Sequence, residues 1–252
     1  MSNRKVVEMF GKNKDNAPII KFIGDIDGIE NDELCIPRSS KTGIPQWWYD
    51  TPMESNGTPT IKKCPSFPDY FSQGYIIPMW EDLTIDFNGE NISITDHTEK
   101  YGYLFDRWQT HPNEQFLNHY SPKIGDRKIE ATMKMVCPWN IITPKGYSTM
   151  ILPLFYNFNE DWTIMPGILD TDIGHQVNTP FLLHSNGKSV NFSKGMPLFV
   201  AIPFKRLKPK FKIIKNNPNL RQDLDQEYID YENMRKDGNP YRKLQKKRDN
   251  GL

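Results

Sequence analysis

Apolar and polar residues alternate over residues 83–94 in a way that predicts two half-buried strands. Apolar side chains stand at every second position of 83–87, and the same alternation resumes over 92–94. Asn88 and Gly89 lie between the two runs. This dipeptide tolerates the positive φ angles that a two-residue hairpin turn requires. The pattern therefore predicts a β-hairpin with one apolar face.

Short apolar runs separated by turn residues continue through the second half of the chain. Five strands are expected there, at residues 139–143, 147–155, 162–170, 180–184 and 197–204. Glycine, proline and asparagine fill the connections between them. A spacing of about 8–14 residues is typical of a β-sandwich or a β-barrel. The centre of the chain is therefore expected to be a β domain.

The N-terminal part, residues 1–59, predicts an extended arm. It contains one expected strand at 18–23 and an aromatic cluster formed by Trp47, Trp48 and Tyr49. Large aromatic side chains of this kind anchor a segment on its own domain or on a neighbouring chain. They can also stack on nucleic acid bases, which is the alternative interpretation.

After residue 215 the spacing of apolar residues changes to three and four, which predicts a helix. Asn219 is the expected N-cap, and Gly238-Asn239-Pro240 is expected to end the helix. Residues 241–248 predict a second, basic helical segment. The apolar stripe of the first helix comprises Leu220, Leu224, Tyr228, Tyr231 and Met234. We therefore expect three parts: an arm at 1–59, a β-rich domain at 60–215 and a helical tail at 216–252.

Charge is unevenly distributed although the net charge is only +1. Residues 205–252 hold 14 basic and 7 acidic residues, whereas the preceding residues hold 18 basic and 24 acidic ones. A basic tail on an acidic body suggests docking on nucleic acid or on an acidic protein surface. A solvated helix without a partner is the alternative. The candidate docking residues are Lys236, Arg242, Lys243, Lys246, Lys247 and Arg248.

Metal and disulfide chemistry find little support in the residue pattern. The three cysteines lie far apart, which argues against a disulfide framework and against structural zinc. The acidic loop at 25–32 lacks the glutamate and the flanking helices of a calcium-binding loop. His97, His111 and His119 follow no ligand spacing. No cofactor is expected, and neither a secretion signal nor a membrane-spanning run is recognised.

Three motifs in order resemble those of the dUTPase and dCTP deaminase superfamily, which has the β-clip fold. They are Lys145-Gly146-Tyr147 before a strand, the segment Pro166–Asp172, and Lys194-Gly195 before the strand at 197–202. The resemblance covers the core segment 138–206. It implies a mainly β, β-clip-like barrel or sandwich of short strands and a homo-oligomer, with a trimer as the family's usual state.

The chain departs from this family at the positions that carry catalysis. Asp170 stands where the resemblance implies the water-activating carboxylate, and Asp172 also matches. Ile173 replaces the tyrosine on which the base stacks, and Pro153–Tyr156 keeps only the proline of the phosphate-binding segment. No glycine-rich C-terminal motif follows. Without these contacts, dUTPase activity is not expected.

A second resemblance, to uncharacterised proteins of tailed phages, particularly marine ones, extends over most of the chain to Arg206. It rests on Pro45-Gln46-Trp47-Trp48, on residues 62–67 and on residues 74–78. It implies a phage protein located in the host cytoplasm, in the virion or in both.

Three functions are consistent with these patterns. The first is a non-enzymatic virion component or assembly factor that uses the β domain to oligomerise and to bind other phage proteins. The second is a diverged nucleotide hydrolase or metal-dependent enzyme around Asp170, Asp172 and His175, because residues two apart on a strand share a face. The alternative for these aspartates is a role in a turn. The third function is an intracellular phage module that binds a host protein.

Overall fold

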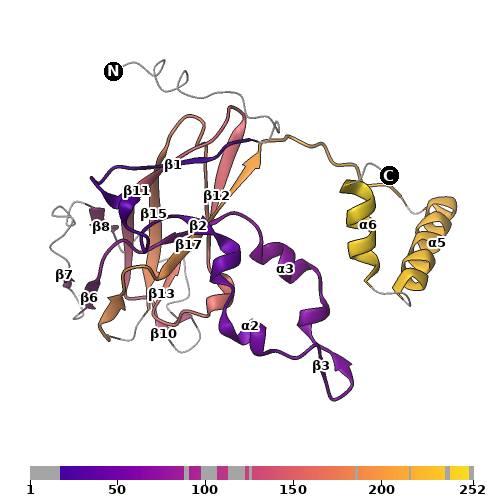
Figure 1. Cartoon of the computed structure of the whole chain (residues 1–252), viewed down its shortest axis with the longest axis horizontal. Helices are drawn as coiled ribbons and strands as arrows, with labels where there is room; N and C mark the ends of the chain where they lie inside the picture. The colour runs from indigo at the N-terminus through magenta and orange to yellow at the C-terminus, as the bar shows by residue number, and fades with distance from the viewer. Residues whose placement is uncertain are drawn as a thin grey trace. The chain divides into compact units, whose positions relative to one another are not determined.

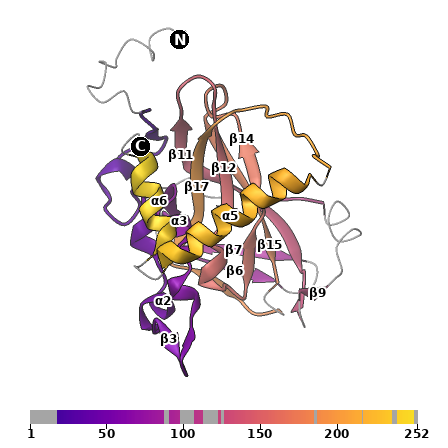
Figure 2. The ribbon, with the colours of Figure 1, turned by 90° about the vertical axis from the view of Figure 1, so that its right-hand side faces the viewer.

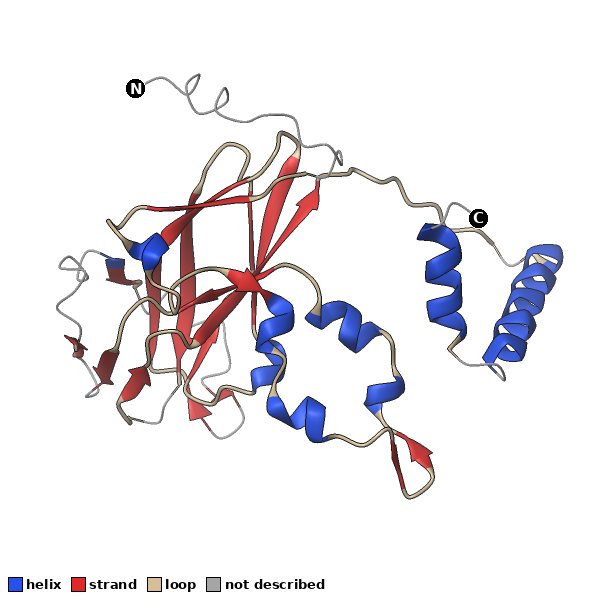
Figure 3. Cartoon of the chain, in the orientation of Figure 1, coloured by secondary structure: helices blue, strands red, loops and turns tan. Residues whose placement is uncertain are grey.

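The computed structural model describes residues 18–87, 91–97, 107–112, 123–124, 127–184, 187–215, 217–235 and 239–249. The chain divides into two compact units. The β unit comprises Met1–Pro45 and Ser72–Arg206, and the helical unit comprises Gln46–Phe71 and Leu207–Leu252. Figure 3 shows that strands dominate the first and helices the second. The three-part division at residues 59 and 215 stays a prediction.

Three antiparallel sheets make up most of the β unit (Figure 1). The first has the order β1-β11-β15-β13, from Lys21–Gly24, Ala131–Ile142, Gln176–Leu183 and Trp162–Ile164, and β8 (Trp108–Thr110) also pairs with β11. The second has the order β14-β12-β17-β5-β2, from Gly167–Leu169, Tyr147–Pro153, Pro197–Lys205, Tyr75–Pro78 and Arg38–Ser39. The third has the order β16-β6-β7, from Val190–Phe192, Leu83–Phe87 and Ile92–Asp96.

The fold is mainly β, as the sequence predicts, and the sheets formed by the described residues are open. None of their strand orders returns to its first strand, so these residues form no closed barrel. Two further two-stranded ladders are β9 (Lys123–Ile124) with β10 (Arg127–Lys128), and β3 (Glu54–Ser55) with β4 (Thr58–Pro59).

The predicted hairpin is confirmed, and its two strands are β6 and β7. Phe87 faces Ile92 and Leu83 faces Asp96 across the antiparallel ladder. The Asn88-Gly89 turn itself lies outside the described residues. The remaining strand of this sheet, β16, has no counterpart among the strands expected from the sequence.

The expected strand at 162–170 is wrong as a single element. It forms two strands in different sheets: β13 pairs with β15, and β14 pairs with β12. Pro166 separates them because proline has no N–H to donate to a ladder. The expected strand at 139–143 is the end of the longer β11, which begins at Ala131.

The core of the β unit is rich in aromatic residues. Trp108 contacts Trp80, Phe181 and Phe192, with ring centroids 5.8–6.2 Å apart. Trp162 packs at 5.4 Å from Phe192. Such pairs add to the free energy gained from apolar burial. Of the N-terminal arm, residues 21–24 form the edge strand β1 on β11, so this part belongs to the β unit.

Two segments distant in sequence make the helical unit. The first supplies α2 (Gln46–Asp50), η3 (Ile61–Lys63) and α3 (Ser66–Phe71), and the second supplies α5 (Pro218–Arg235) and α6 (Pro240–Asp249). Asp69 of α3 pairs with Arg242 of α6 and accepts a hydrogen bond from Gln245 at 3.0 Å. No helix in the described part of the chain is long and apolar enough for a membrane crossing.

The start of α5 differs from the prediction of Asn219 as N-cap. The helix begins at Pro218, and the Asn217 side chain accepts a hydrogen bond from the Asn219 amide at 3.0 Å. Proline suits the first helical position because its missing N–H would have no partner there. Most of the predicted apolar stripe faces solvent, since Leu220, Leu224 and Tyr228 are exposed.

Candidate functional site

The two candidate aspartates lie at one end of the second sheet, in a turn that follows β14. Strand β12 separates β14 from β17, and its residues set the register of both: Thr149 faces Leu169, and Ser148 faces Phe204. This register brings Asp170 and Asp172 next to Arg206, which directly follows β17. Figure 2 shows these three strands. We call Ser148, Asp170, Asp172 and Arg206 the Arg206 cluster.

Arg206 binds both aspartates. Its Nη1 donates to Asp172 Oδ1 at 2.8 Å and lies 2.9 Å from Asp170 Oδ1, while Nη2 pairs with Asp172 Oδ2. The Ser148 hydroxyl donates to Asp170 Oδ1 at 2.6 Å, and the Gly146 amide donates to Asp172 Oδ2 at 2.8 Å. The Asp172 side chain is only 5% exposed. A planar guanidinium matches a carboxylate in this two-bond arrangement.

These contacts stabilise the charged forms of all three ionisable groups. The hydrogen bond from Arg206, followed by that from the Gly146 amide, lowers the pKa of Asp172 to about 2. The Ser148 hydroxyl, and then Arg206, lower the pKa of Asp170. The same pairing raises the pKa of Arg206, with Asp172 as the main cause. Both carboxylates are therefore ionised and weakly basic at neutral pH.

A buried network of hydroxyls holds the turn beneath the cluster. The side chain of Thr171 points the other way from its two aspartate neighbours, and its Oγ1 lies 2.9 Å from Thr143 Oγ1 and 2.8 Å from Thr149 Oγ1. Thr149 and Thr171 are fully buried. These contacts fix the backbone that presents both aspartates to Arg206.

His175, the third candidate of the possible enzyme site, does not join the aspartates in the contacts of the cluster. Its Nδ1 lies 2.9 Å from the Thr171 carbonyl oxygen. Within the described ranges, no group of three or more His, Cys, Asp or Glu side chains could hold a metal ion. The sequence interpretation missed Arg206 and Ser148. The signal in the sequence was the position of Arg206 at the end of an expected strand. To place Arg206 beside the aspartates, one must also know how β12 pairs with β14 and β17.

The aromatic candidates belong to the helical unit and differ in exposure. Trp48 is a core residue there, because its ring stacks on Phe67 at 5.6 Å and meets Phe71 edge-on at 5.2 Å. Trp47 is half-buried, and Tyr49 is exposed. Of the three predicted binding residues, Trp48 is therefore already engaged within its own unit.

The basic candidate residues of the tail also differ in whether they are exposed or engaged within the helical unit. Arg242 is held by Asp69 and donates to the Pro65 carbonyl oxygen at 3.3 Å, so it fastens α6 to α3. Lys246, Lys247 and Arg248 are exposed in the last turn of α6, and Lys243 is half-buried. Lys236 lies outside the described residues. Cations in a last helical turn are favoured by the helix dipole.

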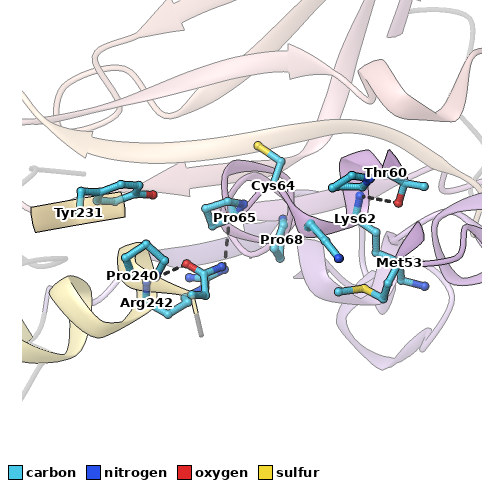
Figure 4. A pocket seen from close by; sticks show the side chains of 12 residues that line it. Met53, Thr60, Lys62, Cys64, Pro65, Pro68, Tyr231, Pro240 and Arg242 are labelled. Carbon is cyan, nitrogen blue, oxygen red and sulfur yellow. Dashed lines mark hydrogen bonds between the residues drawn. The ribbon is translucent and has the colours of Figure 1, made fainter. Parts of the chain in front are cut away.

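A cavity of about 810 Å³ lies in the helical unit (Figure 4). Its lining includes Met53, Thr60, Lys62, Cys64, Pro65, Pro68, Tyr231, Pro240 and Arg242. The ammonium group of Lys62 donates to the carbonyl oxygens of Tyr49 and Thr51, both at 2.9 Å. Lys62 and Arg242 thus direct their charges to groups of the unit itself, and the cavity is not arranged as an anion site.

No protein-family model matches the chain, and no curated protein matches its sequence. The solved structures that it resembles include phage dUTPases. The dUTPase of phage phi11 of S. aureus matches with 10% identity over 34% of this chain and 73% of its own, with a TM-score of 0.27. A mutant dUTPase of Staphylococcus bacteriophage 80alpha matches with 10% identity over 58% of this chain and 84% of its own, with a TM-score of 0.32. The likeness is partial and transfers no activity or partner to this chain.

Proposed function

We propose that this chain is a non-enzymatic phage protein, either a virion component or an assembly factor. Its β unit would serve as a scaffold for homo-oligomers, and its exposed basic tail would dock on nucleic acid or on an acidic surface. The observation that carries the proposal is the Arg206 cluster, in which both candidate catalytic carboxylates are engaged in ion pairs and hydrogen bonds.

A nucleotide hydrolase needs a carboxylate that can take a proton from water. A base is effective when its pKa lies near the working pH. The pKa of Asp172 is about 2, and that of Asp170 is also lowered. The nearest guanidinium, that of Arg206, is bound to these two carboxylates instead of being directed to a phosphate. These facts favour a structural role for the cluster.

The enzymatic alternative is tested by incubating the purified protein with a panel of deoxynucleoside triphosphates, with and without Mg²⁺ or Mn²⁺. We expect no pyrophosphate release in any condition. Turnover that disappears in the Asp170→Asn variant and survives in a matched Asp161→Asn variant would overturn the proposal. Asp161 is an exposed aspartate outside the cluster.

Whether the protein is part of the virion is tested by mass spectrometry of purified, nuclease-treated particles of the source phage. Stoichiometric presence of the chain would support a virion component. Its absence from particles, together with its presence in assembly intermediates, would support an assembly factor. Absence from both, with capture of a host protein in infected cells, would replace the proposal by an intracellular binding module.

The role of the tail is tested by nucleic-acid binding at several salt concentrations. Replacing Lys246, Lys247 and Arg248 with glutamine should weaken binding and reduce the dependence of log K on log salt by about three. Lys145→Gln, which removes an exposed lysine of the β unit, is the control. Binding that is unchanged after truncation at Lys215 would exclude the tail as the nucleic-acid surface.

A further inference from the structure

The segment Leu207–Lys215 presents apolar and cationic side chains together to solvent. We call it the linker segment, and Figure 1 draws it as the extended trace between β17 and α5. It has no regular secondary structure, and every one of its residues is exposed. Phe211 is 89% exposed and Ile213 is 85% exposed. Large, neighbouring apolar side chains in solvent indicate a surface that a partner covers.

The linker segment is also strongly basic. Lysines occupy positions 208, 210, 212 and 215, and the segment contains no acidic residue. The run without acidic residues extends further, from Lys205 to Gln222, and it includes seven basic residues. A partner that covers the linker segment is therefore expected to carry negative charge.

Apolar and charged residues alternate over positions 207–213. Apolar side chains occupy 207, 209, 211 and 213, and lysines occupy 208, 210 and 212. In an extended chain, alternate residues face opposite sides, so one face is apolar and the other is cationic. Pro209 favours this conformation, because it disfavours helical backbone at the preceding residue. The two faces therefore need two different surroundings.

Nucleic acid offers suitable surroundings to only one of these faces. Its phosphates attract lysines, and a base can stack on Phe211, but the aliphatic side chains of Leu207 and Ile213 have no ring for stacking. An anionic bilayer offers both, because its negative headgroups lie directly above the acyl chains. Lysine side chains can lay their methylene groups along the apolar layer and keep the ammonium group at the headgroups. The pattern thus favours an anionic lipid surface over nucleic acid.

We propose that the linker segment binds the surface of an anionic phospholipid bilayer. The segment lies in the headgroup region, with Phe211 and Ile213 directed to the acyl chains and the lysines at 208, 210 and 212 directed to the lipid phosphates. The contact is with one face of the bilayer and requires no helix. It does not depend on the proposed function, because the basic residues of α6 take no part in it.

The charge requirement is tested by flotation of the full chain with phosphatidylcholine vesicles that contain about 30% phosphatidylglycerol. We expect binding that weakens as salt rises, and no comparable binding to vesicles of phosphatidylcholine alone. Combining Lys208→Gln, Lys210→Gln and Lys212→Gln should raise the dissociation constant about a hundredfold, since each lysine near an anionic surface contributes about fivefold. The matched control removes three exposed lysines of the β unit, Lys41, Lys145 and Lys188.

The apolar face is tested by Phe211→Ser, which leaves the charge of the segment unchanged. Burial of the phenyl ring in the lipid should make this variant bind the anionic vesicles about tenfold more weakly than wild type. Phe155→Ser is the matched control, because Phe155 is a phenylalanine of the β unit that is 65% exposed. Circular dichroism of each variant verifies that the fold is retained.

A photoreactive p-benzoylphenylalanine at position 211 of the full chain identifies what covers the segment. After irradiation with bound vesicles, mass spectrometry should find phospholipid attached to the peptide that contains position 211. The same residue placed at position 210, on the cationic face, should give several-fold less of this product. Crosslinks only to protein in the vesicle-bound chain would overturn the inference.

Three other outcomes would also overturn it. The first is the absence of vesicle binding at low salt, and the second is equal binding to the two kinds of vesicle. The third is binding of duplex DNA that is lost in the triple lysine variant but unchanged in Phe211→Ser, without vesicle binding, which would assign the linker segment to nucleic acid. Loss of vesicle binding in both linker variants, with binding retained in both controls, is the result that the inference requires.

Discussion

Replacing Glu81 with glutamine should stabilise the protein at neutral and alkaline pH. Glu81 is fully buried, and its Oε1 accepts a hydrogen bond from the Trp108 indole N–H at 3.3 Å. Its Oε2 has no hydrogen-bond partner among the described residues. Burial, with a smaller contribution from Asp96, raises the pKa of Glu81 to about 8, against the opposing effect of Trp108. Ionisation of this side chain therefore opposes folding.

The size of the effect follows from the two pKa values. The folded state holds the proton up to about pH 8, whereas an unfolded chain releases it near the ordinary glutamate pKa of 4.5. The contribution of Glu81 to stability is thus fully present below pH 4.5 and is lost as pH rises through 8. Each pKa unit corresponds to about 1.4 kcal/mol, so the free energy of unfolding should fall by about 3 kcal/mol between pH 5 and pH 8.

The assay is guanidinium denaturation of wild type and Glu81→Gln at several pH values, followed by tryptophan fluorescence. Glutamine can still accept the Trp108 hydrogen bond but cannot ionise, so the variant should lose most of this pH dependence. Glu33→Gln removes an exposed carboxylate of the β unit and serves as the control. A Glu81→Gln variant with the same pH slope as wild type would refute the reasoning.

Three further predictions concern other contacts. Arg206→Ala should lower the melting temperature at neutral pH and bring the pKa of Asp172 back toward its usual range. Because pairing with Arg206 lowers that pKa, the stabilisation by Asp172 is present above pH 4 and is lost as pH falls through 2. Acid titration of the wild type and the variant measures this difference. Gly74→Ala should destabilise the second sheet, since Gly74 has a φ of +74° and a Cβ there would lie 2.3 Å from a β17 carbonyl oxygen; thermal melting measures it. Trp48→Ala should cost about 3–5 kcal/mol in the helical unit, measured by denaturant titration.

Local patterns in the sequence were sufficient for the hairpin and for most strands. Asn88-Gly89 between two alternating runs indicates a hairpin because its turn and its register are set by neighbouring residues. The Arg206 cluster could not be predicted in this way. Asp172 and Arg206 lie 34 residues apart and meet only because β12 pairs with both β14 and β17. The sequence identified the two aspartates as candidates, but it did not identify Arg206 as the cation that pairs with them.

The sequence also does not predict which individual side chains are buried. From the sequence, Trp48 could anchor its segment on its own domain or on a neighbouring chain, or stack on bases. The sequence does not show that Phe67 and Phe71 of α3 pack against it. Nothing near Glu81 in the sequence indicates that a carboxyl group lies in the core, because the residues around it in space come from distant strands. Such positions are defined by tertiary packing and not by periodicity.

Cys64 gives the chain a built-in attachment point for chemical probes. Cys64 is the exposed one of the three cysteines; Cys35 and Cys137 are buried. The Ser66 hydroxyl, followed by its backbone amide, lowers the pKa of the Cys64 thiol, whereas burial raises the pKa of Cys137 to about 12. A maleimide dye should therefore attach at one position of the native chain without any mutation. The stepwise bleaching of single assemblies labelled in this way would count the copies that they contain.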